Sequence, residues 1–119
     1  MRHFIVIIAF VCCKKIEGIF VFIYPTITSN SYFDIQSDYD IGKVDQNYLY
    51  DVLSEIDLKD ADALFISCTA LPALPIIDKL EKKLNKIVLS SNQALIWDTL
   101  ERIGKNESIQ GFGKLFKSN

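Results

Sequence analysis

The chain of 119 residues is half hydrophobic, which is enough for one domain with a real core but small for a complete two-lobed enzyme. Its 13 basic and 15 acidic residues nearly cancel, and no basic stripe follows any expected helix, so we expect neither nucleic acid nor a membrane as a partner. Three cysteines and one histidine, His3, match no zinc pattern and no disulfide framework, which predicts no metal site and a reducing, cytoplasmic location.

Residues 1–13 have a basic start and an apolar run, which is the outline of a secretory signal. No Ala-x-Ala-like site follows, and a second apolar run, Gly18 to Tyr24, comes soon after. Neither run reaches the length of a membrane span. The preferred interpretation is two β-rich strands, or one strand and a poorly specified segment, so residues 1–30 stay poorly specified. The polar, turn-forming stretch Pro25 to Ser37 predicts a loop.

A helical pattern begins at Asp45, which stands where an N-cap is expected. Apolar residues recur at three- and four-residue spacing after it, which predicts an amphipathic helix that packs on a sheet. The residues of this stripe are Tyr48, Leu49, Val52, Leu53 and Ile56.

The stretch Ala61 to Thr69, ADALFISCT, predicts a buried strand over Ala63 to Cys68 with a helix directly after it. The second amphipathic helix has Pro75 near its first turn, where a missing N–H does no harm. Its apolar stripe is Leu74, Ile76, Ile77, Leu80 and Leu84, and its outer face, interpreted as a solvated surface, carries Lys79, Glu81, Lys82 and Lys83.

Ile87 to Leu89 predicts another short strand, and the next residues, Ser90-Ser91-Asn92-Gln93, have the S-x-x-Q form of a capping box that opens a third helix. Gly104 can supply the left-handed residue that ends this helix. We expect the tail, Ile109 to Phe116, to close back on the domain as a loop. The stripe expected to be buried in the third helix is Leu95, Ile96, Leu100 and Ile103.

This alternation of helices and strands with short connections predicts one α/β domain over residues 1–119, a three-layer sandwich with a mostly parallel sheet. The strand Ala63 to Cys68 is expected to be central. Because ligands of open α/β sheets bind beyond the carboxyl ends of the strands, the chemistry is expected at Cys68.

A cysteine that leaves a buried strand before a helix gains from the helix dipole and from unpaired backbone N–H groups, and both favour the thiolate. Cys68 is therefore the candidate nucleophile or proton carrier, ranked ahead of Cys12 and Cys13. The alternative is that Cys68 is a small apolar core residue. A triad or dyad with histidine would need His3, and so the N-terminus, to fold onto the site.

Hydroxyl and amide side chains surround this position in the expected sheet. They could form a cradle for a substrate carboxylate together with backbone amides, or they could be ordinary helix caps. The candidate substrate-binding residues are Ser67, Thr69, Ser90, Ser91 and Asn92.

The segment Ala61 to Gly104 resembles the C-terminal lobe of the aspartate/glutamate racemase superfamily. Within that group it is most similar to maleate cis-trans isomerases, arylmalonate decarboxylases and ectoine-utilisation proteins. The similarity rests on the strand followed by SCT, on the helix start SSNQA, on the pair Trp97-Asp98 and on GFGKLF, Gly111 to Phe116. With SDYDIGKVD, Ser37 to Asp45, it extends over residues 38–116.

The resemblance implies a cofactor-free enzyme of two similar α/β lobes, with one cysteine from each lobe at an active site between them. Cys68 matches the cysteine of the C-terminal lobe. The implied reactions are racemisation, cis-trans isomerisation or decarboxylation of a small carboxylic acid such as an amino acid, maleate or an arylmalonate.

The chain begins about where the second lobe of that family begins, so a first lobe with its cysteine is expected to be missing. We therefore expect a homo-oligomer, or a partner that supplies the missing N-terminal lobe. Three interpretations stay open. The chain is an isomerase, racemase or decarboxylase; or it is a catalytically incomplete lobe that binds a small carboxylate or a protein; or it is a processed or secreted fragment.

Overall fold

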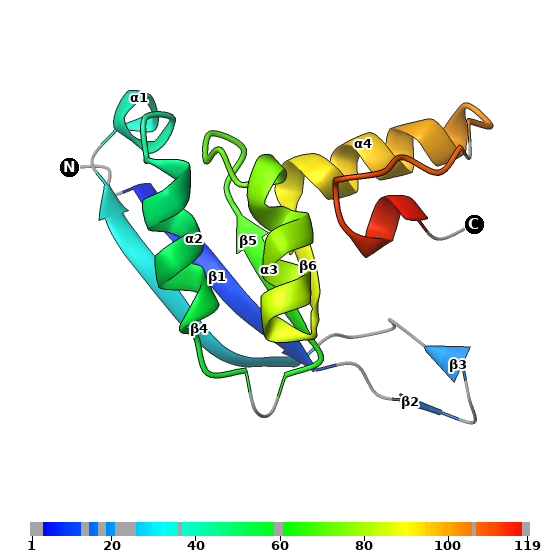
Figure 1. Ribbon diagram of the computed structural model, residues 1–119, viewed down its shortest axis with the longest axis horizontal. Coiled ribbons are helices and arrows are strands. Elements are labelled where there is room, and N and C mark those ends of the chain that lie inside the picture. The colour runs from blue at the N-terminus through cyan, green and yellow to red at the C-terminus, as the bar shows by residue number, and fades with distance from the viewer. Residues whose placement is uncertain are drawn as a thin grey trace.

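In the computed structural model, two α-helices lie across one face of a four-stranded sheet (Figure 1). The structure describes residues 4–12, 15–16, 19–20, 26–35, 37–58, 61–105 and 107–117, with side chains from residue 27 onward. The main sheet consists of β1 (Phe4–Cys12), β4 (Thr26–Ile35), β5 (Ala63–Ser67) and β6 (Ile87–Ser90), and a separate pair consists of β2 (Lys15–Ile16) and β3 (Ile19–Phe20). The helices are α1 (Asp38–Ile41), α2 (Gln46–Ser54), α3 (Ile77–Leu84) and α4 (Ser91–Arg102), with the short 3-10 helices η1 (Leu74–Ile76) and η2 (Lys114–Lys117).

The expectation of a loop over Pro25 to Ser37 is wrong, because β4 occupies most of this stretch and pairs along its length with β1. Six of the ten residues of β4 are threonine, isoleucine, tyrosine or phenylalanine, and these residue types favour strands. Its polar residues fit an edge strand that has one face towards solvent, as the 67% exposure of Tyr32 illustrates. The predicted strand within Met1 to Cys13 is confirmed as β1.

The sheet has the order β4-β1-β5-β6, so the predicted strand β5 is central. β1 is antiparallel to both β4 and β5, whereas β5 and β6 are parallel. β4, β5 and β6 therefore share a direction, but two of the three pairs of neighbouring strands are antiparallel. The described sheet is thus mixed, and its parallel pair is β5 and β6. The carboxyl ends of β4, β5 and β6 meet at one edge of the sheet, which we call the carboxyl edge.

The core lies between the sheet and the helices α2 and α3. Asp45 caps α2 as predicted, since one of its carboxylate oxygens accepts hydrogen bonds from the N–H groups of Asn47 and Tyr48, both at 2.9 Å. Tyr48 itself is exposed, so its place in the predicted buried stripe is wrong. The fully buried residues of this layer are Leu49, Leu53, Leu64, Ile66, Ile77, Leu80 and Val88.

The predicted buried stripe of α4 is also wrong, because Leu95 and Ile103 are each 64% exposed and Ile96 is 41% exposed. In Figure 1, α4 extends away from the sheet instead of lying along its second face. Helices thus cover one face of the sheet in the described part of the chain, and the second helical layer of the expected three-layer sandwich is not formed there. No helix that the structure describes is long and apolar enough to span a membrane.

Gly104 ends α4 as predicted, with a φ of 71°. The N–H of Gly104 donates to the carbonyl of Glu101, and the N–H of Lys105 donates to the carbonyl of Leu100. These two hydrogen bonds form a Schellman motif, which satisfies carbonyl groups that the end of a helix otherwise leaves unpaired.

Candidate active site

Cys68 directly follows β5 at the carboxyl edge, where it is half-buried, free of any disulfide and packed against the core. The expectation that a helix follows at once is wrong. Residues 69–73 form an irregular turn before η1, and α3 begins only at Ile77. Leu71 and Ala73 are buried, and this anchors the turn to the core. The first residue of α3 therefore follows Cys68 by nine positions in the sequence. Pro75 stands in the first turn of η1, as expected.

The end of β6 carries the predicted capping box. The hydroxyl of Ser90 accepts a hydrogen bond from the backbone N–H of Gln93, and the side-chain oxygen of Gln93 accepts one from the backbone N–H of Ser90, both at 3.2 Å. Ser90 is 3% exposed, and its hydroxyl is committed to this cap. This arrangement gives Ser90 the capping role that was the alternative to substrate binding.

The structure brings the two predicted groups of residues together through Asn92. Its side-chain amide nitrogen donates a hydrogen bond to the carbonyl of Thr69 at 2.9 Å, across 23 residues of sequence. Ser67 and Ser91 are half-buried, and Thr69 is exposed. The turn after Cys68 and the first turn of α4 therefore form one continuous surface at the carboxyl edge.

A third segment at this edge was not assigned any site residue from the sequence. It is α1, which follows β4 and is capped by the hydroxyl of Ser37 accepting a hydrogen bond from the N–H of Asp40. A side chain at Gly42 would lie 3.7 Å from the carbonyl of Ala70, which places the end of α1 against the Cys68 turn. The serine and aspartate three residues apart were the sequence signal for this helix start.

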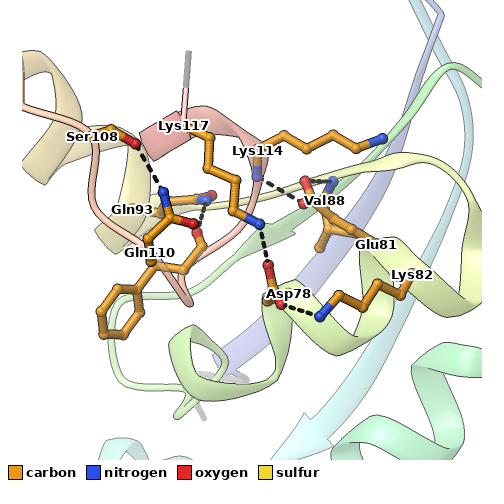
Figure 2. A network of polar contacts seen from close by, with 10 residues as sticks. Asp78, Glu81, Lys82, Val88, Gln93, Ser108, Gln110, Lys114 and Lys117 are labelled. Carbon is orange, nitrogen blue, oxygen red and sulfur yellow. Dashed lines mark hydrogen bonds and ion pairs between the residues drawn. The ribbon is translucent and has the colours of Figure 1, made fainter. Parts of the chain in front are cut away.

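The tail GFGKLF closes back on the domain, as predicted, and buried polar side chains hold it there (Figure 2). The interpretation of Glu81 as part of a solvated face is wrong, since Glu81 is 4% exposed. Its carboxylate accepts hydrogen bonds from the N–H groups of Val88 at 3.1 Å and Lys114 at 2.7 Å. The amide nitrogen of Gln93 donates to the carbonyl of Phe112 at 2.7 Å. The lysines Lys79, Lys82 and Lys83 are exposed, as that interpretation expected.

Asp78 adds two ion pairs on the same side of α3, with Lys117 in the tail and with Lys82, both at 2.7 Å. The hydrogen bonds from Lys117 and then Lys82 lower the pKa of Asp78 from 3.8 to about 2. The ionised carboxylate is therefore the form that links the tail to α3.

One cavity of about 580 Å³ lies between α2 and α3 and is lined by Asn47, Tyr50, Ile76, Lys79, Lys82 and Lys83. None of these residues belongs to the three segments at the carboxyl edge, so this cavity lies apart from the candidate site around Cys68. Within the described ranges, no group of three or more histidine, cysteine, aspartate or glutamate side chains could hold a metal ion. His3, Cys13 and the side chain of Cys12 lie outside the part of the chain that the structure describes.

A protein-family model described as arylmalonate decarboxylase matches residues 25–116 of the chain. The maleate isomerase of Geobacillus stearothermophilus is 26% identical over 90 residues, which cover 75% of this chain and 36% of that protein.

Solved structures agree with this match. The maleate cis-trans isomerase of Nocardia farcinica, bound to Tris, has a TM-score of 0.65 at 25% identity and covers 71% of this chain and 35% of its own. A structure of arylmalonate decarboxylase has a TM-score of 0.63 at 28% identity, with coverage of 73% and 40%. A cysteine-to-serine variant of the Nocardia isomerase, with a TM-score of 0.66 at 24% identity and coverage of 72% and 36%, carries a covalently bound succinylcysteine intermediate. The chain thus spans well under half the length of each of these proteins.

Proposed function

The chain belongs to the arylmalonate decarboxylase family, and from this premise we propose that it is a cofactor-independent, cysteine-dependent enzyme, or the C-terminal half of one. Its substrate is a small carboxylic acid such as maleate, an arylmalonate or an amino acid, and its reaction is of the isomerase, decarboxylase or racemase type. Cys68 is the reactive thiol. Its free state suits a reducing compartment, and a cytoplasmic location is part of the proposal.

One observation carries the proposal: a free, half-buried cysteine at the carboxyl end of the central strand, beside the first turn of α4. Bound ligands of open α/β sheets occupy this position, where loops and the N-terminal amides of a helix favour an anion. The residues proposed to contact the substrate carboxylate are Ser67, Thr69 and Ser91, together with the second N–H of the Asn92 side-chain amide, whose first N–H is donated to Thr69. Ser90 supports them as the helix cap.

With maleate as substrate, the thiolate sulfur of Cys68 forms a bond to one alkene carbon, the π bond breaks and the other carbon takes up a proton. Rotation about the resulting single bond, followed by loss of that proton and of the thiolate, gives fumarate. With a malonate, loss of carbon dioxide leaves an enediolate, and the thiol donates a proton to its carbon. Both roles need a thiol that exchanges its proton near neutral pH.

We further propose that a second lobe completes the site, supplied by a second copy of the chain or by an N-terminal lobe of the kind that the family has. Two observations support this part. The exposed apolar side chains Leu95 and Ile96 of α4, with Ile103 at its C-cap, form the kind of surface that usually mediates association. The chain also spans only 36% of the Geobacillus isomerase and 40% of the decarboxylase structure.

The test is incubation of the full chain with maleate, with peptide mass spectrometry to locate any adduct. A succinyl adduct on Cys68 that forms faster than on Cys12 or Cys13, and disappears in Cys68→Ser, supports the proposal. NMR follows the two reactions in parallel: the appearance of fumarate from maleate reports isomerisation, and the loss of phenylmalonate reports decarboxylation. The Cys68→Ser variant should lose any turnover and keep its fold, since a hydroxyl is a far weaker acid and nucleophile.

Two other results are informative. Protection of Cys68 from iodoacetamide by maleate or malonate, without any adduct or turnover, would favour the catalytically incomplete binding lobe instead. If Cys68 stays unmodified in the native chain while Cys12 or Cys13 reacts, the assignment of the reactive thiol is wrong, and the proposed function falls with it.

A further inference from the structure

Asn92 joins the two halves of the candidate site, and it does so at Thr69, the exposed residue of the turn after Cys68. Thr69 directly follows Cys68 and is exposed, so its carbonyl could bond to water instead of to protein. The amide of Asn92 donates to that carbonyl at 2.9 Å. The bond fixes the direction of the peptide group after Thr69, and thereby the path of the turn. Because water can replace it, its loss should change geometry more than stability.

The next residue, Gln93, fixes Asn92 in turn. Gln93 is fully buried, and both polar atoms of its side chain have partners on different segments. Its oxygen accepts from the N–H of Ser90 at the end of β6, and its nitrogen donates to the carbonyl of Phe112 in the tail. A buried amide without these partners would cost free energy, so both bonds are kept together. Figure 2 shows Gln93 between the start of α4 and the tail.

The tail itself is anchored independently of Gln93. Glu81 accepts the N–H of Lys114, and Asp78 pairs with Lys117. Gly113 lies so close to α3 that an added Cβ would be 2.6 Å from Ile77. The tail is therefore a fixed support against which Gln93 holds the first turn of α4.

We propose that Asn92 and Gln93 are positioning residues, which hold the Cys68 turn against the first turn of α4 and couple its geometry to the docking of the tail, Gly111 to Lys117. The inference rests on the proposed role of Cys68. It assigns Asn92 the task of shaping the site through Thr69, in addition to any contact with substrate. It also gives the GFGKLF motif a function beyond closing the domain.

The test compares alkylation of Cys68 by iodoacetate, which carries a carboxylate, with alkylation by uncharged iodoacetamide, in the full chain. The ratio of the two rates reports how well an anion is held beside the thiol. Asn92→Ala should lower this ratio at least about threefold, the size expected for one hydrogen bond. Asn47→Ala is the matched control, because Asn47 is also the second residue of its helix, α2, and should leave the ratio unchanged.

Gln93→Met tests the coupling to the tail, with the exposed Gln110→Met as its control. It should lower the same ratio and speed tryptic cleavage after Lys114, whereas Gln110→Met should do neither. The double variant of Asn92 and Gln93 should lower the ratio no further than the stronger single variant, since both act on one turn.

An Asn92→Ala chain with the wild-type ratio would overturn the inference. The inference is also overturned if Asn92→Ala makes both reagents react faster by the same factor and shifts the urea unfolding transition, because that pattern means loss of structure alone. The proposed function fails separately if wild-type Cys68 forms no adduct with maleate and its ratio of iodoacetate to iodoacetamide rates is no higher than that of a free thiol in solution. The inference is then decided by the iodoacetamide rate of Asn92→Ala, and a rate equal to that of Asn47→Ala refutes it.

Discussion

The buried carboxylate of Glu81 accepts a hydrogen bond from the backbone N–H of Lys114 at 2.7 Å, across 33 residues of sequence. The same carboxylate accepts a hydrogen bond from the backbone N–H of Val88, a residue of the edge strand β6. One side chain therefore provides the hydrogen-bond acceptor for a backbone N–H of strand β6 and for the first backbone N–H of η2. Together with the buried side chain of Phe116, this contact explains how a short tail keeps a fixed place on the domain.

Replacing Glu81 by alanine should lower the free energy of unfolding by about 2–4 kcal/mol, because two backbone N–H groups lose their partner in a buried place. Glu81→Gln should cost less than half of this, since the amide oxygen can still accept one of the two bonds. Urea unfolding followed by circular dichroism measures both changes. The exposed Glu55→Ala is the control and should stay near the wild type. Equal effects of Glu81→Ala and Glu55→Ala would contradict the buried role of Glu81.

Gly113→Ala should destabilise the chain more than Gly111→Ala. Both glycines have a positive φ, 88° and 92°, so both variants pay the cost of about 1 kcal/mol for a left-handed alanine. Only at Gly113 would the new Cβ also meet Ile77 at 2.6 Å, whereas nothing lies within 4 Å at Gly111. The new Cβ would also lie 3.0 Å from the side-chain nitrogen of Gln93, so the difference between the melting temperatures reports the packing of the tail against α3 and Gln93. The contact is refuted if the two variants melt together.

The ion pairs of Asp78 predict a dependence of stability on pH. Hydrogen bonds from Lys117 and Lys82 lower the pKa of Asp78 in the folded chain to about 2, below its ordinary value of 3.8. Asp78 therefore stabilises the fold above about pH 4, and this contribution disappears as the pH falls from about 4 to about 2. The difference in unfolding free energy between the wild type and Asp78→Asn should shrink over this interval. Asp51→Asn serves as the exposed control, and a difference that stays constant down to about pH 2 would count against the ion pairs.

A charge on the exposed face of α4 should weaken any association of the chain without loss of fold. Leu95→Lys places an ammonium group at a position that is 64% exposed, where the monomer loses little packing. Sedimentation velocity at high micromolar concentration should show a smaller mean mass than for the wild type. Tyr48→Lys, at an exposed aromatic position on α2, is the matched control and should leave the mass unchanged. A wild-type chain that is already monomeric at this concentration would remove the support for a second copy at α4.

Local signals in the sequence determined the succession of β5, α3, β6 and α4 and the ends of the helices. Asp45, the Ser90 and Gln93 capping box and Gly104 all have the predicted roles, because each acts within about four residues of its own position. The same local pattern placed Cys68 at the end of a central strand. The α/β class followed from this pattern, whereas the family came from the resemblance of the motifs between Ser37 and Phe116 to known proteins, and both are confirmed.

Tertiary structure alone decided which surfaces are buried and which segments meet. The stretch Thr26–Ile35 became a strand because β1 supplies its hydrogen bonds, and Glu81 is buried because the tail folds over it. Leu95, Ile96 and Ile103 of the predicted stripe remained exposed, although their periodicity is that of a buried helix. The bond from Asn92 to Thr69 joins residues 23 positions apart. Periodicity and caps report what a segment can form by itself, whereas burial and long-range hydrogen bonds depend on partners that no local pattern specifies.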